Sequence, residues 1–261
     1  MQSYRTVKSK GFTLLEILVS LSLIAFIVGA SFYFSVNMSD RHRLALGRMK
    51  VDRALHDLVE IVSEDLSCII LIDKGFPVFE FANDRNRREF IISFFSSNNE
   101  EHVTKMVQYR IKTIDDLHKS FTKFELSSAD SLLVQSALNH QSSLHENFSK
   151  YTPNRVSVLG DGLLDFNIRA AIRTPSGGIF VSPTNKSLTY DGGCLHYKKA
   201  EIAVHARGMP LFMDITVRAL TETTERKLSS TEFKSKYDRA LFLASEVRKS
   251  FRRIALKSSF F

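Results

Sequence analysis

With 261 residues, 44% of them hydrophobic and 25% charged, the chain has ordinary globular composition, which excludes disorder over most of its length. Its 21 Phe residues, against only 11 Gly and five Pro, can supply a large apolar core and exclude a scaffold made of loops alone. The formal net charge of +8 favours a solvated basic surface, or weak attraction to acidic lipid or nucleic acid, and assigns no function by itself.

An apolar segment near the N-terminus gives the strongest signal. Residues 12–36 contain one ionisable side chain, Glu16, apart from the phenol of Tyr33. As a helix, these 25 residues would extend about 37 Å, against about 30 Å for the hydrocarbon core of a bilayer. We therefore expect a membrane-spanning helix over residues 12–36. Three cations and no acidic residue precede this helix, which places the N-terminus in the cytoplasm by the positive-inside rule. The cations are Arg5, Lys8 and Lys10.

The residues at the start of this segment reverse the order of an ordinary secretory signal. Such a signal has its apolar region before the cleavage site, whereas here a short basic stretch comes first. The sequence Lys10-Gly11-Phe12-Thr13-Leu14-Leu15-Glu16 resembles the class III leader of type IV pilins and pseudopilins. The competing interpretation is a plain signal anchor in which Gly11-Phe12 occurs by chance.

The resemblance implies a specific processing event. A prepilin peptidase would cut between Gly11 and Phe12 on the cytoplasmic face and N-methylate Phe12, so that residues 1–11 are a cleaved leader. The apolar helix would then remain as the permanent anchor. Gly11 suits a peptidase cleft because its backbone is unencumbered. Loss of the three leader cations would lower the net charge from +8 to +5.

Glu16 carries the mechanistic expectation. A carboxylate near the centre of an apolar helix costs roughly 2.5 to 3.5 kcal/mol on insertion scales. Cleavage creates an α-amino group at Phe12, and Glu16 of one subunit can meet that amine on a neighbour. Such a pair is attractive in low dielectric only when aligned, so it would select the register at which a subunit joins a filament. The alternative is a Glu16 close enough to the interface to stay hydrated.

The helical pattern continues beyond the membrane segment. Residues 37–67 carry apolar side chains at spacings of three, four and seven, with charged residues between them. This predicts an amphipathic stalk helix whose apolar face packs on the following domain. The apolar positions are Leu44, Val51, Leu55, Leu58, Val62 and Leu66.

Residues 68–261 are predicted to form an extracytoplasmic, β-rich domain. Alternating apolar and polar residues indicate an antiparallel sheet, with a turn at 174–178 and a polar loop insertion at 127–151. Asp161-Gly162 and Asp191-Gly192 indicate further turns. The predicted strands are 76–81, 90–95, 103–111, 123–126, 165–172, 179–182, 202–206 and 211–219.

The C-terminal region is predicted to be helical. Ser229 and Glu232 have the spacing of a capping box, and apolar residues from Phe233 to Ile254 recur every three or four positions. The segment Arg248–Lys257 is strongly basic, and the sequence leaves open whether it is a helix or a strand.

The predicted order of elements is the α+β plan of pilin-like proteins: a long N-terminal helix, half transmembrane and half amphipathic, packed on an antiparallel β-sheet domain. Four segments further resemble J-type minor pseudopilins of type II secretion, although that family tends to have a strand in its last basic stretch, whereas the spacing here favours a helix at least as far as Val247. The presence of Glu16 argues against the K-type tip subunit, which typically lacks this acid. The four segments are 107–111, 159–166, 209–217 and 251–253.

The common catalytic and metal-binding motifs are absent from the sequence. The sequence has no Gly-x-Ser-x-Gly, His-Glu-x-x-His, P-loop or Gly-x-Gly-x-x-Gly motif, so we expect neither enzyme activity nor a cofactor or metal. Cys194, His196 and His205 are explained by turn and strand positions. Cys68 and Cys194 could pair in an oxidising compartment, but their spacing cannot establish it.

The expected function is therefore structural. The resemblance implies a minor pseudopilin at or near the tip of a type II secretion pseudopilus, spanning the inner membrane once with its domain in the periplasm. Its partners would be major and minor pseudopilins (I- and K-type among the latter), the prepilin peptidase, the inner-membrane assembly platform and membrane lipid, with nucleic acid unlikely. The alternative is a minor pilin of a type IV pilus or competence system that binds DNA or a surface, with Arg248–Lys257 as the basic face.

Overall fold

The computed structural model describes residues 13–69, 79–84, 86–98, 103–115, 117–127, 144, 148, 151–173, 177–182, 188–190, 194–197, 206–207, 212–233 and 235–256. The chain forms two compact parts, Met1–Gly47 and Arg48–Phe261, and their boundary falls inside the first helix.

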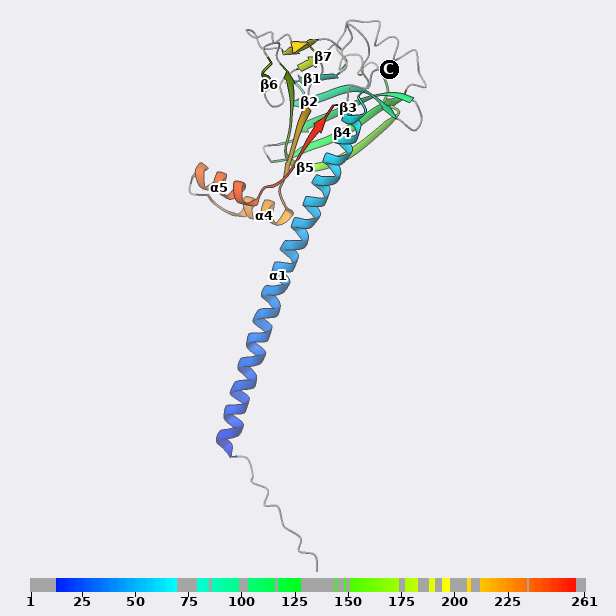
Figure 1. Ribbon diagram of the computed structural model, residues 1–261. Helices are drawn as coiled ribbons and strands as arrows, with labels where there is room; N and C mark the ends of the chain where they lie inside the picture. The colour runs from blue at the N-terminus through cyan, green and yellow to red at the C-terminus, as the bar shows by residue number, and fades with distance from the viewer. Residues whose placement is uncertain are drawn as a thin grey trace, which may run out of the picture. The chain divides into compact units, whose positions relative to one another are not determined.

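Helix α1 (Leu14–Ser67) includes both the predicted membrane segment and the predicted stalk (Figure 1). No Pro occurs within it, so no backbone N–H is missing from its hydrogen-bond ladder. The predicted apolar face is buried at Leu55, Leu58, Val62 and Leu66. Val51 packs at the margin of the core. Of the predicted face, Leu44 is the exception, with 36% of its surface exposed.

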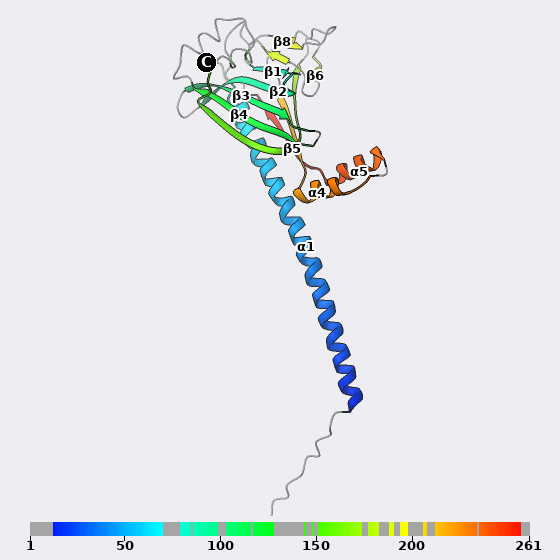
Figure 2. The same ribbon diagram turned by 180° about the vertical axis from the view of Figure 1, so that it is seen from behind.

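The strands of the described residues form one antiparallel sheet in the order β11-β10-β5-β4-β3-β2-β1-β7-β8-β9, with β6 paired to β5 (Figures 1 and 2). This confirms the predicted α+β fold of a long N-terminal helix on an antiparallel sheet. The strands are β1 (Phe79–Asp84), β2 (Glu89–Asn98), β3 (Val103–Thr113), β4 (Lys119–Ser127), β5 (Arg155–Arg173), β6 (Ile179–Val181), β7 (Leu188–Tyr190), β8 (Cys194–Tyr197), β9 (Ala206–Arg207), β10 (Phe212–Ala219) and β11 (Arg248–Ala255).

Most predicted strands are present, and several are longer than their sequence pattern indicated. The predicted strand at 165–172 is only the second half of β5. The turn predicted at Asp161-Gly162 is wrong, because both residues lie inside β5 where its register against β4 shifts. Gly162 takes a φ of 81° there, so the glycine allows a bulge and not a chain reversal. Asp191-Gly192 and most of the strand predicted at 202–206 lie outside the described residues.

The main core lies between the second half of α1 and one face of the sheet. Beneath the helix, aromatic rings from four consecutive strands form a ladder, with ring centroids 6.1, 5.3 and 4.8 Å apart from β2 to β5. The helix lies close to β5 at Gly160, where an added Cβ would be in ordinary van der Waals contact, 3.5 Å from Cδ1 of Leu58. The ladder consists of Phe94, Tyr109, Phe121 and Phe166.

A polar cluster near the C-terminal end of α1 fixes the helix on the sheet. The Nζ of Lys123 lies 2.6 Å from Oδ2 of Asp65, and the Tyr109 hydroxyl donates a hydrogen bond to the same carboxylate. Lys123 also pairs with Glu125 at 2.5 Å. We call these four residues the Asp65 cluster. Its side chains from α1, β3 and β4 satisfy one another where the helix meets the sheet.

The loop insertion predicted at 127–151 stays a prediction. Most of it lies outside the described residues, but Leu144 and Phe148 are helical and buried. They pack in a second, smaller apolar cluster with Phe95, Met106 and Leu126. The segment therefore contributes core residues four positions apart, one helical turn, which its polar composition concealed.

The C-terminal helix prediction is also partly wrong. Helices α4 (Glu222–Ser230) and α5 (Lys236–Glu246) are capped by Thr221 and Ser235, so Ser229 lies inside α4 and forms no capping box with Glu232. The segment after Glu246 is strand β11. Pairing with β10 buries Ile254 beside Met213, and this burial overrides the helical spacing.

Candidate functional site

The described chain begins at a helix cap that contains the predicted functional carboxylate. Glu16 Oε2 accepts hydrogen bonds from the backbone N–H of Thr13 at 2.9 Å and from its hydroxyl at 3.1 Å. In return, the Glu16 N–H donates to Thr13 Oγ1 at 3.3 Å. This reciprocal arrangement is a capping box, which the sequence analysis missed although the Thr-x-x-Glu spacing could have indicated it.

The capping box changes the expectation for Glu16. Its carboxylate has two donors within its own chain, so part of the cost of placing it in an apolar environment is offset before any neighbour arrives. Both donors belong to Thr13, on the mature side of the predicted cleavage bond, and cleavage would leave them in place. Gly11 and Phe12 lie outside the described residues, so cleavage and methylation there stay predictions.

The first part of α1 exposes apolar side chains on all sides. Leu14 is 81% exposed and Phe26 is 76% exposed, values typical of a helix that has no packing partner in its own chain. An 18-residue window of the helix has a mean hydropathy of 2.3 and no buried share, which makes the helix apolar enough to cross a membrane.

Two serines inside this segment are satisfied locally. Ser20 Oγ donates to the Glu16 carbonyl at 2.7 Å, and Ser22 Oγ donates to the Leu18 carbonyl at 2.8 Å. Hydroxyls bonded to the preceding turn need no water, and they leave small side chains where another helix can approach closely. The segment therefore fits lipid or neighbouring helices as its surroundings.

Two cations of the predicted basic face at Arg248–Lys257 are paired with carboxylates within the described part of the chain. Arg248 Nε donates to Asp52 Oδ1 at 2.7 Å. Arg253 makes two hydrogen bonds to Asp214, at 2.7 and 2.9 Å, and its guanidinium lies 3.9 Å from the Phe212 ring centroid. Ion pairing of this kind weakens the case for a phosphate-binding strip along this segment.

A disulfide between Cys68 and Cys194 stays a prediction. Cys68 follows the last turn of α1 and is half-buried, while Cys194 begins β8 with its side chain outside the described atoms. Among the residues that the structure describes, no three His, Cys, Asp or Glu side chains are grouped to hold a metal ion.

Comparison with known families identifies the N-terminal region. Residues 7–32 match the family model described as the prokaryotic N-terminal methylation motif. The match covers the predicted leader bond, the capping box and most of the exposed apolar segment. Searches among curated proteins and among solved structures gave no match. The motif and the apolar helix together indicate a protein anchored in a membrane by a single N-terminal span.

Proposed function

We propose that this chain, whose methylation motif and fold are those of a type IV pilin-like protein, is a minor pseudopilin of a type II secretion pseudopilus. The observation that carries the proposal is the motif at residues 7–32 on a helix whose first part is apolar and unpacked. A helix exposed in this way is suited to lateral assembly with similar helices, so the role is structural and not catalytic.

Two further observations favour a minor subunit of the J-type. The basic C-terminal stretch is a strand, β11, as in that family, which removes the one departure found in the sequence. The domain after α1 is large and carries the additional helices α4 and α5 between its last two strands. A bulky domain suits a position at the filament tip, where few copies must stack. Its partners would then be the major pseudopilin, the I- and K-type minor subunits and the inner-membrane assembly platform.

The first test concerns leader processing. In cells that contain a prepilin peptidase, mass spectrometry should find a mature chain beginning at N-methylated Phe12. Gly11→Val should leave the full-length precursor in the membrane, because the side chain hinders the peptidase cleft. Gly47→Val is the matched control, since no atom lies within 4 Å of a Cβ placed at Gly47. A mature chain that begins at Met1, or at a residue after Phe12 within the apolar segment, would contradict the leader assignment.

The second test separates two roles of Glu16. Glu16→Ala should leave leader removal intact and reduce crosslinking to neighbouring subunits, because the acid that meets the partner amine is absent. Thr13→Val keeps the carboxylate and the backbone N–H while removing the hydroxyl of the capping box, so recruitment should persist. Equal loss in both variants would assign Glu16 to helix capping alone.

A third test distinguishes secretion from a pilus or competence system. Deletion of the gene should abolish export of secreted proteins and leave surface pili and DNA uptake unchanged. Loss of pili or of DNA uptake with normal export would instead support a minor pilin that binds DNA or a surface.

A further inference from the structure

Strand β11 forms one end of the sheet. It pairs with β10 along its whole length, and no described strand pairs with its other edge. Backbone N–H and C=O groups along such an edge are a template for another extended chain. Lys249, Phe251 and Arg253 lie on the sheet face opposite the main core, because their β10 partners alternate with the buried Met213 and Ile215.

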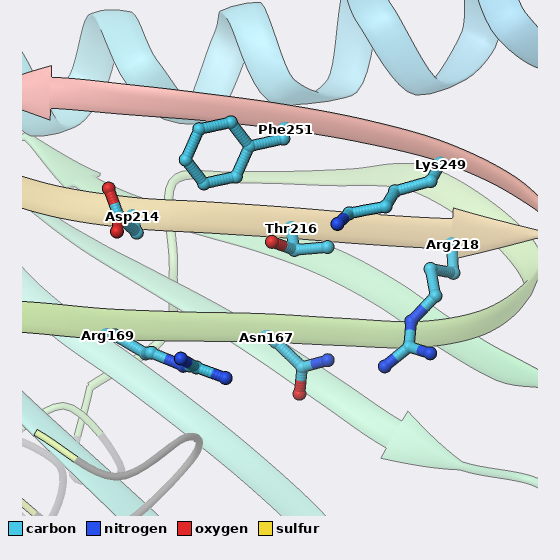
Figure 3. Close-up of a pocket in the computed structure, with 7 residues that line it drawn as sticks. All are labelled: Asn167, Arg169, Asp214, Thr216, Arg218, Lys249 and Phe251. Carbon is cyan, nitrogen blue, oxygen red and sulfur yellow. The ribbon is translucent and has the colours of Figure 1, made fainter.

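A groove of about 310 Å³ runs beside this edge on the same face (Figure 3). It carries three cations, Arg169, Arg218 and Lys249, against one carboxylate, Asp214. Arg253 already holds that carboxylate with two hydrogen bonds. The remaining residues that line the groove are Asn167, Thr216 and Phe251.

Two of these cations retain hydrogen-bonding capacity. Lys249 makes no ion pair with any residue that the structure describes. One Nη of Arg218 reaches Asp165 at 3.0 Å, but its Nε is buried without an acceptor. A small rotation of this half-exposed side chain would present Nε to a carboxylate brought into the groove. The groove therefore has donors in excess of acceptors.

Charge on the edge decides which occupant fits. Cationic side chains on an end strand commonly protect it from pairing with other chains. With Phe251 opposite Phe251, two antiparallel copies of β11 would place Lys249 opposite Arg253, which disfavours a second copy of this strand. An acidic strand meets no such repulsion.

We infer that the free edge of β11 and the adjacent groove dock an extended, acidic segment of a partner protein, which adds to the sheet as a further strand. The segment places a carboxylate opposite Lys249 and an apolar side chain opposite Phe251, which is 53% exposed. This surface is distinct from the leader and from Glu16, and the inference holds whichever filament the chain joins.

A polypeptide fits this surface better than a nucleic acid does. Only a polypeptide can use the main-chain edge, because strand addition requires backbone N–H and C=O groups on the partner. Phe251 offers an apolar surface to a side chain, and its position on an alternating strand matches the period of an extended peptide.

The experiment measures binding of a labelled, end-capped Glu-Thr-Val-Thr-Glu peptide to the full-length protein in detergent. Fluorescence anisotropy should show saturable binding that weakens with added salt. Lys249→Glu should weaken it roughly tenfold, because an exposed attraction becomes a repulsion. Lys236→Glu, which changes net charge equally at the start of exposed α5, should leave it unchanged. A peptide N-methylated at alternate residues should not bind, because it cannot pair along the edge.

Several outcomes would overturn the inference. Equal loss in Lys249→Glu and Lys236→Glu would reduce the effect to net charge. Undiminished binding of the N-methylated peptide would exclude strand addition. A single-stranded oligonucleotide that binds through Lys249 while the peptide does not would assign the groove to nucleic acid.

Discussion

Both parts of α1 carry apolar side chains, but those of the first part are exposed, whereas those on one face of the second part are buried. Leu18, in the first part, is 58% exposed, whereas Leu58, in the second, is 3% exposed. The second part finds its partners in the sheet of its own chain, while the first finds none among the described residues. The comparison indicates that one helix serves two environments: its own core at one end and, under the proposed function, lipid or other subunits at the other.

Truncating one leucine in each part tests this comparison directly. This pair of variants has the largest expected effect on stability. Leu58→Ala should lower the free energy of unfolding by about 2 to 5 kcal/mol, because it opens a cavity beneath the helix. Leu18→Ala should leave domain stability unchanged. Denaturant unfolding of the detergent-solubilised protein, monitored by aromatic fluorescence or near-UV circular dichroism, measures both variants. A comparable loss in Leu18→Ala would mean that the first part packs on the domain.

The Asp65 cluster tests why the second part stays in place. Asp65→Ala should cost about 2 kcal/mol, because the Tyr109 hydroxyl loses its acceptor and Lys123 loses one of two carboxylates. Asp57→Ala, at an exposed position on the same helix, is the matched control and should change stability little. Equal effects of the two variants would assign the cluster no role in anchoring the helix.

Acid should weaken the same cluster in a defined direction. Burial raises the pKa of Glu125, but its pairing with Lys123 and Lys105 outweighs this and leaves the pKa below its ordinary value. The resulting stability is present above the unfolded-state pKa of the carboxyl and is lost as pH falls through the lower folded-state pKa. Glu125→Gln should therefore flatten the acid limb of the stability profile. An unchanged acid limb would assign that slope to other carboxylates.

Periodicity alone predicted much of this architecture. Alternation identified β3 and β10, a short apolar run identified β2, and the spacing from Val51 to Leu66 identified the buried face of α1. The predictions for α1 and β10 succeed because each of these elements buries one face against the core, which imposes its period on the sequence. The exposed apolar segment could also be predicted from the sequence, because its length and composition suit a bilayer.

Other features depend on partners distant in sequence. Phe251 and Ile254 fit a helix by spacing, and only pairing with β10 places them in a strand. Leu144 and Phe148 resembled scattered apolar residues in a polar loop until packing on Phe95 revealed them as core. The groove draws its residues from β5, β10 and β11, so no local motif could indicate it. The Thr13 capping box was local and could have been predicted.

The smallest expected effect concerns a contact at the periphery of the packed part, where the side chains are partly exposed. We expect its contribution to stability to be smaller than that of Leu58 and larger than that of Leu18. His118 Nδ1 lies 2.9 Å from Asp115 Oδ1, and Nε2 lies 3.6 Å from Glu225 at the start of α4. Its hydrogen bond to Asp115 raises the pKa of His118 above its ordinary value. The contribution is fully present below about pH 6.5, the unfolded-state pKa, and is lost as pH rises through the higher folded-state pKa. Because these side chains are partly exposed, the change should be only a few tenths of a kcal/mol.

His118→Gln should remove this slope near neutral pH, whereas His56→Gln, at an exposed position on α1, should preserve it. A slope that persists in His118→Gln would place the titrating group elsewhere and leave the contact with α4 without a measurable role in stability.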